Sequence, residues 1–88
     1  MPGETIYTIP DDVLTAQLQG EAVLLHLQTK SYYRLNATAA RIWKGVEDRL
    51  EPSQIVNMLM QEFAVPRKTA QTETERTLRD LCARGLLT

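Results

Sequence analysis

The chain has 88 residues, of which 43% are hydrophobic and 24% charged, as in ordinary globular proteins. This length predicts one domain over residues 1–88. Ten basic and eleven acidic residues give a formal net charge of -1, without the basic excess typical of nucleic-acid-binding domains. The sequence has neither a signal-peptide pattern nor a long apolar run, so we expect a cytoplasmic protein without a nucleic-acid or membrane partner.

The first third of the chain predicts three strands. The segment "TIYTI", residues 5–9, alternates β-branched and aromatic side chains and stops at Pro10, which is typical of a short strand. The next ten residues, "DDVLTAQLQG", are interpreted as a connection that ends in a turn. Two apolar-aromatic strands follow, 21–27 and 31–35, with a break between them of a length suited to a tight hairpin.

The loop length of this hairpin decides which side chains share a face. A three-residue loop places five apolar side chains together, namely Val23, Leu25, Leu27, Tyr33 and Leu35. A two-residue loop instead groups Leu24 with Tyr33 and Leu35. We prefer the three-residue loop because it gathers more apolar area, and the other parity stays open.

Three helices are predicted after the sheet, over about 37–50, 52–63 and 66–84. Asn36 is a good N-cap and Pro52 suits a first helical position. We expect the last helix to end in a left-handed turn at Gly85, with Leu86 contacting Leu81 in a Schellman motif. The predicted class is α+β, an antiparallel three-stranded sheet followed by a three-helix bundle.

The third helix combines apolar and polar residues along its inward stripe. The predicted stripe consists of Ala70, Thr74, Thr77, Leu78, Leu81 and Cys82. Glu73, Arg76 and Asp80 lie beside its threonine-rich middle. Two interpretations remain open. The threonines mark the rim of the core, or they line a polar groove.

Catalytic and metal-binding patterns are missing from the sequence. His26 lies on a predicted strand, where we expect it to face solvent. Cys82 lies on an inward helix stripe, where a buried, unreactive role is expected. One His and one Cys cannot form the usual metal motifs, and no glycine-rich phosphate loop occurs. We therefore expect a protein that is not an enzyme and needs no cofactor or metal.

Two modes of binding suit the predicted elements. An extended peptide can add to strand 31–35, which lacks proline and carries only one charge, Arg34. Alternatively, a winged helix-turn-helix domain binds DNA through a recognition helix. The third helix offers six basic or amide side chains, but Glu73, Glu75 and Asp80 are interspersed with them and would repel phosphate. A structural or antitoxin-like protein without a peptide ligand is a third alternative.

The segments "VLLHLQTKSYYRLNATAARIW" (23–43), "IVNMLMQEF" (55–63) and "LCARGLLT" (81–88) together resemble the PqqD-like family. This family comprises the recognition elements that bind precursors of ribosomally made, modified peptides (RiPPs). The resemblance covers about residues 21–87, and "YYRLNATAARIW" is its most specific part. One departure is Lys30, which stands where the family often has Gly, and a left-handed Lys costs about 1 kcal/mol.

The resemblance implies a winged helix-turn-helix-like fold whose third strand accepts the leader part of a precursor peptide in a groove against the third helix. It implies that one tyrosine of the pair packs inward while the other stays near the edge. The expected peptide-binding residues are Ser31, Tyr32, Tyr33, Arg34, Leu35, Glu73, Thr74, Arg76, Thr77, Leu78, Asp80 and Leu81.

The resemblance also implies the protein partners. The sequence of strands 21–27 and 31–35 and of the loop between them is most similar to that of the stand-alone proteins of lasso-peptide clusters. Their partners are the precursor peptide, a separate transglutaminase-like leader peptidase and an ATP-dependent cyclase that acts afterwards. The alternative within the family is the D protein of pyrroloquinoline-quinone (PQQ) biosynthesis, whose partner is a radical enzyme.

Overall fold

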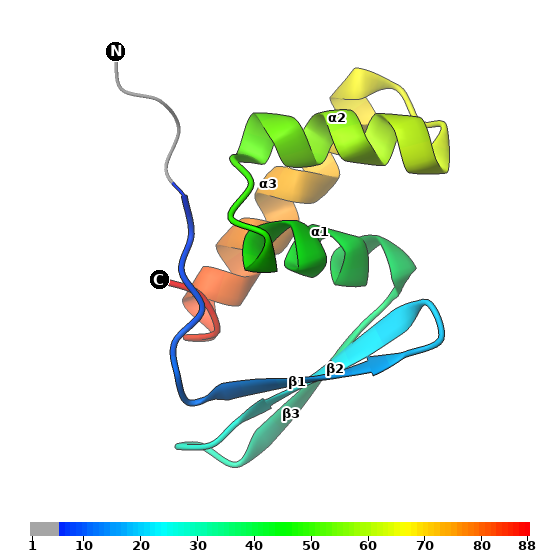
Figure 1. Ribbon diagram of the computed structural model, residues 1–88. Helices are drawn as coiled ribbons and strands as arrows, with labels where there is room; N and C mark the ends of the chain where they lie inside the picture. The colour runs from blue at the N-terminus through cyan, green and yellow to red at the C-terminus, as the bar shows by residue number, and fades with distance from the viewer. Residues whose placement is uncertain (1–5) are drawn as a thin grey trace.

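The computed structural model describes residues 6–88, which form an antiparallel sheet followed by three helices (Figure 1). The strands are β1 (Val13–Leu18), β2 (Glu21–His26) and β3 (Ser31–Leu35), in the spatial order β1-β2-β3. The helices are α1 (Ala37–Glu47), α2 (Pro52–Phe63) and α3 (Arg67–Ala83). The predicted α+β class is confirmed.

The first strand of the sheet is not the predicted one. Of the segment 5–9, Thr5 lies outside the described residues and the other four form no strand. This segment runs beside the chain end, where the backbones of Thr8 and Thr88 exchange hydrogen bonds of 3.0 and 2.9 Å. β1 is formed instead by "VLTAQL", which the sequence analysis interpreted as a connection. The prediction was wrong because a two-residue turn ending in Gly20, at φ 71°, folds this segment back onto β2.

The β2–β3 hairpin has the parity that we did not prefer. Leu24 lies opposite Tyr33, so Leu24, Tyr33 and Leu35 share the face toward the helices. Val23 and Leu25 face away from the helices and are only half-buried. Both faces of β2 are apolar, so the sequence pattern contains no signal that separates one register from the next.

The loop of this hairpin explains the shift in parity. It contains four residues, 27–30, with Leu27 exposed and Lys30 in the left-handed region at φ 61°. The one-residue shift turns His26 inward, where it is only 7% exposed. The expectation of a solvent-facing histidine was therefore wrong.

α1 begins at the predicted residue and ends three residues early. The Asn36 side chain caps it by accepting the backbone N–H three residues further on at 2.9 Å. The helix ends at Glu47 because Arg49 adopts φ 61° and the Leu50 N–H donates to the Gly45 carbonyl at 3.0 Å. This is a Schellman turn with arginine in the usual glycine position, which is why the sequence did not reveal it.

The other two helices follow the prediction closely. α2 has the predicted bounds, and α3 is one residue shorter at each end than predicted. Gly85 stands at φ 75° after α3, and the Leu86 N–H donates to the Leu81 carbonyl at 2.9 Å. The predicted Schellman motif at this end is confirmed.

The core lies between one face of the sheet and the three helices. Trp43 of α1 is fully buried, and its indole N–H donates to the Thr15 hydroxyl of β1 at 3.0 Å. α1 and α2 approach closely at Gly45, where a Cβ would lie 2.8 Å from Ile55 Cγ1. The largest fully buried side chains are Trp43, Leu24, Ile42, Ile55, Leu59, Leu86 and Thr74.

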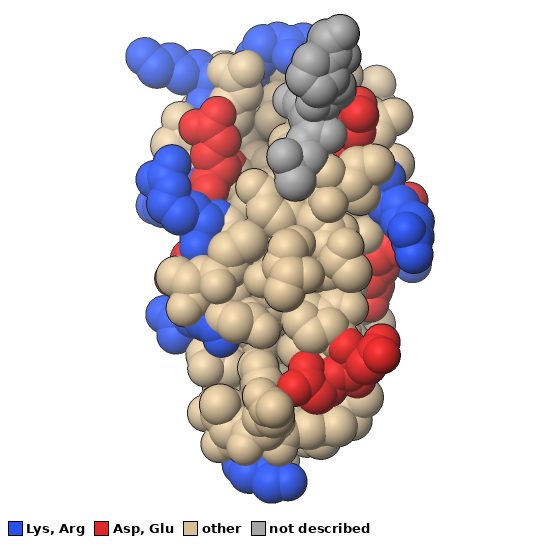
Figure 2. All heavy atoms as spheres, turned by 90° about the vertical axis from the view of Figure 1, so that its left-hand side faces the viewer, with Lys and Arg blue, Asp and Glu red and all other residues tan. Residues whose placement is uncertain are grey.

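The elements form two layers, the sheet on one side and the three helices on the other (Figure 1). α1 lies on one face of the sheet, with α2 and α3 packed behind it. The other face of the sheet carries no described element, and Tyr32 on it is 72% exposed. Figure 2 shows that the charges on one side of the molecule gather at its margins around an uncharged centre. Within residues 6–88, no helix is long and apolar enough to cross a membrane.

Candidate functional site

β3 forms one edge of the sheet, since β2 is its only neighbouring strand among residues 6–88. The Leu27 N–H donates to the Asp12 carbonyl at 2.8 Å, so the next pair along the strands, Val13–His26, is a non-hydrogen-bonded pair. Hydrogen-bonded and non-hydrogen-bonded pairs alternate along antiparallel strands, so Leu24 is not hydrogen-bonded to β1. Its N–H and C=O groups point to the other side, where Leu24 is the hydrogen-bonded partner of Tyr33 in β3.

The same alternation assigns the free backbone groups of β3. Ser31, Tyr33 and Leu35 direct their N–H and C=O groups toward β2. Tyr32 and Arg34 direct theirs away from the sheet, where the described part of the chain offers no partner. This edge therefore presents two donors and two acceptors at the spacing of a strand partner.

The two tyrosines of β3 have different surroundings. Tyr33 is half-buried against the core, and the Arg84 guanidinium lies 5.4 Å from its ring centroid. Arg84 follows the last turn of α3, so this cation–π contact joins β3 to α3. Tyr32 points to the opposite face and is 72% exposed. This division matches the expectation of one inward tyrosine and one near the edge.

The α3 residues of the expected site divide by burial. Thr74 is fully buried, and its Oγ1 has no hydrogen-bond partner among the described residues. Leu78 and Leu81 are also buried, whereas Thr77 and Glu73 are half-buried. Thr77 is therefore partly accessible at the surface of α3, whereas Thr74 belongs to the core. The two threonines therefore differ, and neither a place at the rim of the core nor a place in a polar groove describes both Thr74 and Thr77.

The charged residues beside β3 and α3 are paired with one another. Arg34 contacts Glu21 of β2 at 2.9 Å, on the outer face of the sheet. Along α3, the guanidinium of Arg76 bonds Glu73 at 2.6 Å, and that of Arg84 bonds Asp80 at 3.1 Å. Sequence reasoning did not identify Arg84, because its position over Tyr33 depends on how the end of α3 meets the sheet.

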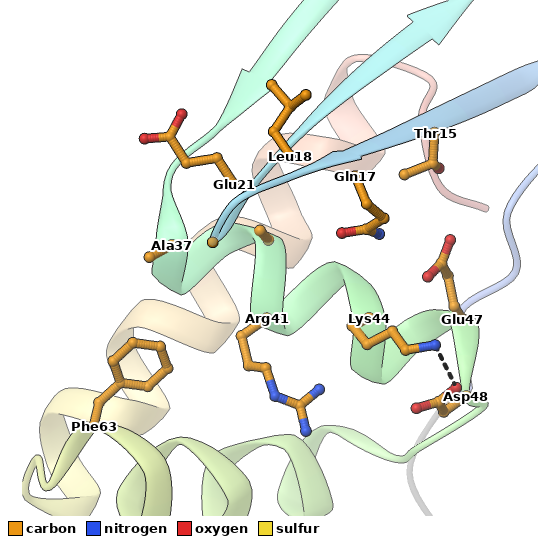
Figure 3. Close-up of a pocket in the computed structure, with 12 residues that line it drawn as sticks. Thr15, Gln17, Leu18, Glu21, Ala37, Arg41, Lys44, Glu47, Asp48 and Phe63 are labelled. Carbon is orange, nitrogen blue, oxygen red and sulfur yellow. Dashed lines mark ion pairs between the residues drawn. The ribbon is translucent and has the colours of Figure 1, made fainter.

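Two hollows in the described structure lie away from the β3 edge. The larger, of about 810 Å³, is an open groove between β1 and α1 (Figure 3). Arg41 in its lining bonds Glu62 at 2.7 and 2.9 Å, which lowers the pKa of the Glu62 carboxyl and raises that of Arg41. The smaller, of about 170 Å³, lies between the three helices and includes Glu73 in its lining.

Of the groups considered for catalysis, His26 is buried and Cys82, which was expected to be buried, is half-buried. The His26 Nδ1 finds no hydrogen-bond partner within residues 6–88. Burial raises the pKa of the Cys82 thiol, which disfavours the reactive thiolate. No group of three or more His, Cys, Asp or Glu side chains that could hold a metal ion occurs in the described part of the chain.

Comparisons with known proteins identify a family and two solved structures that this chain resembles. The family model for coenzyme PQQ synthesis protein D (PqqD) matches residues 21–87. No curated protein sequence matches the chain.

Two solved structures share the fold. One is TbiB1 in complex with the TbiA(beta) leader peptide, which is 39% identical and has a TM-score of 0.85, over 90% of this chain and 92% of that one. The other is lasso peptide synthetase B1 complexed with the leader peptide, which is 25% identical and has a TM-score of 0.88, over 96% and 99% of the two chains. Since the family model spans most of the sequence and the fold is shared almost end to end, this chain belongs to the PqqD family.

Proposed function

We propose that this chain binds the leader segment of a ribosomally made precursor peptide and presents it to a separate leader peptidase of a lasso-peptide pathway. The leader adds as a further strand to the free edge of β3. The observation that supports this most strongly is the 39% identity with TbiB1, a protein solved with a leader peptide. The unpaired backbone groups of Tyr32 and Arg34 supply the matching physical feature.

The strand partner contributes alignment more than affinity. Four backbone hydrogen bonds to Tyr32 and Arg34 would contribute about 2–6 kcal/mol, at roughly 0.5–1.5 kcal/mol each. Ordering a flexible peptide costs about 2–5 kcal/mol, which largely offsets this gain. Net affinity must therefore come from apolar leader side chains, at about 25 cal/mol per Å² buried. We place their contacts between Tyr33 and the half-buried Thr77 of α3.

The remaining residues of the site have supporting roles in this proposal. Ser31 and Leu35 keep β3 paired with β2, and Thr74, Leu78 and Leu81 form the buried support beneath Thr77. The paired charges Glu73, Arg76 and Asp80 border the groove on the α3 side. Arg34, which pairs with Glu21, borders it on the outer face of the sheet.

A binding assay with matched variants tests this function. The probe is a fluorescein-labelled TbiA(beta) leader peptide, and its binding is measured by fluorescence polarisation. Tyr33→Ala should weaken binding at least about fivefold, and Thr77→Glu should do the same by placing a charge in the groove. Thr72→Glu is the matched control, because Thr72 is exposed on the same helix.

Amide chemical shifts locate the peptide independently. Titration of the leader should move signals of residues 31–35 and of the second half of α3. Unchanged affinity in both variants, or shifts confined to other elements, would refute the β3 site.

The family match also suits a second function, presentation of the PQQ precursor to a radical enzyme, since the matching model describes a PQQ synthesis protein. The structure of lasso peptide synthetase B1 with the leader peptide favours the lasso pathway, because this chain shares its fold over 96% of its length. Competition between a lasso leader and the PQQ precursor for the same labelled site would separate the two functions.

A further inference from the structure

The turn that ends α3 is fixed against the sheet. The Arg84 N–H donates to the Asp80 carbonyl at 3.1 Å, and the Leu86 side chain that follows is fully buried. A Cβ at Gly85 would lie 3.7 Å from Nε2 of the buried His26, so this turn rests on β2. Figure 1 shows α3 running toward the sheet, with its C-terminal end the nearer one. The backbone of Arg84 is therefore held by the helix end on one side and by the core on the other.

The Arg84 side chain is held at its far end as well. Its Nε donates to Asp80 Oδ2 at 3.1 Å, and its guanidinium lies 5.4 Å from the Tyr33 ring centroid. A cation at this distance is attracted by the negative face of the aromatic ring. The Arg84 side chain is 50% exposed, whereas Tyr33 is half-buried against the core. Arg84 therefore restrains, from the solvent side, a ring that the core holds only in part.

β3 and α3 leave an open space between them. In the described structure, no Cα atom of β3 lies within 8 Å of a Cα atom of α3. The contact between Tyr33 and Arg84 bridges this space at the C-terminal end of α3. A leader strand added to the edge of β3 would lie beside that contact.

The register of the added strand decides which leader side chain meets Tyr33. Tyr33 directs its N–H and C=O groups toward β2, so the leader residue opposite it forms a non-hydrogen-bonded pair. The Cβ atoms of directly opposite residues lie about 4.5–5.5 Å apart, and both side chains point to the same face of the sheet. That leader side chain therefore packs beside the Tyr33 ring, and the orientation of the ring decides which surface it meets.

We propose that Arg84 is a positioning residue of the leader site and acts through Tyr33. Its guanidinium holds the ring in the orientation against which the opposing leader side chain packs. Asp80 fixes and neutralises the guanidinium, so an apolar leader side chain can approach without leaving that charge unpaired. This inference rests on the proposed function, because the leader strand supplies the side chain that Tyr33 contacts.

A double-mutant cycle with the labelled TbiA(beta) leader as probe tests the proposal by fluorescence polarisation. Arg84→Met keeps an unbranched side chain but removes the guanidinium, so the leader must order the ring itself. Leader binding should weaken about two- to fivefold, the strength of a cation–π contact at the surface. In the Tyr33→Ala background the same change should leave the affinity unchanged, because the ring on which Arg84 acts is gone. The control is Arg79→Met, the same substitution at an exposed residue of α3, which should bind like wild type.

Two results of this cycle would overturn the proposal. One is an Arg84→Met protein that binds the leader as tightly as wild type. The other is a loss of the same size with and without the Tyr33 ring, because Arg84 would then act on the leader or on the fold directly. If circular dichroism shows that Arg84→Met does not fold, Arg84→Gln replaces it, since its amide can still donate to Asp80.

A measurement without leader separates this inference from the proposed function. In the free wild-type chain, we expect nuclear Overhauser effects between the Arg84 side chain and the Tyr33 ring. Arg84→Met should shift the ring proton signals of Tyr33, whereas Arg79→Met should not. If the contact is present but the wild type does not bind the leader, the proposed function is overturned and the orientation of Tyr33 by Arg84 is supported. Absence of the contact would overturn the role of Arg84 whether or not the leader binds.

Discussion

A proline at residue 32 tests the direction of the backbone groups on β3. The register directs the Tyr32 N–H away from the sheet, so Tyr32→Pro removes a donor that only an added strand would use. Proline is tolerated on an edge strand at such a position, so the fold should persist. Tyr33→Pro instead removes an N–H that bonds β2 and should destabilise the hairpin.

The expected magnitude follows from the lost bond. A leader carbonyl left without its donor in a partly dry groove costs about 1–3 kcal/mol, which is roughly a 5- to 160-fold loss of leader affinity. Tyr32→Ala is the control, because it removes the same exposed side chain and keeps the N–H. Fluorescence polarisation gives the affinities and circular dichroism monitors the fold. If a folded Tyr32→Pro protein binds the leader as tightly as Tyr32→Ala, either the strand register or strand addition is wrong.

Three further substitutions test the fold and its electrostatics. Arg49→Gly should raise the free energy of unfolding in urea by about 0.5–1 kcal/mol, because glycine relieves the left-handed strain at φ 61°; a loss would contradict the Schellman turn. Gly45→Ala should lower it by about 1–3 kcal/mol, since the new Cβ meets Ile55 at 2.8 Å, whereas a gain would mean that the helices separate freely. Glu62→Gln should cost less than about 1 kcal/mol at pH 7, because its partner Arg41 is at the surface. The hydrogen bond from Arg41 lowers the Glu62 pKa in the folded state, so this cost should vanish as the pH falls below the ordinary pKa of a glutamate, which urea titrations at several pH values can check.

The sequence predicted the helices more accurately than the sheet, for local reasons. The bounds of α2 and the Schellman turn after α3 follow from Pro52 and Gly85, whose backbone preferences act within a few residues. The end of α1 was missed because Arg49, a residue without a turn preference, adopts the left-handed conformation there.

The strands and their register were predicted less well because they depend on contacts between residues that are far apart in the sequence. "TIYTI" has the stronger strand composition, yet its Thr8 pairs with Thr88 at the other end of the chain. β2 is apolar on both faces, so its alternation could not set the register. Of the candidate site, the β3 segment and the inward Tyr33 followed from the sequence. The burial of Thr74 and the contact of Arg84 with Tyr33 depend on how α3 packs against the other helices and where its end meets β3.

The internal pairing of charges around β3 and α3 has a kinetic consequence. Because Arg34, Arg76 and Arg84 each already bond a carboxylate of the same chain, this region exerts little net field on an approaching peptide. We expect association without electrostatic steering, at about 10⁵–10⁶ M⁻¹s⁻¹, and nearly the same between low and high ionic strength. Discrimination among leaders would then reside in how long each one stays bound, a quantity set by the apolar contacts at Tyr33.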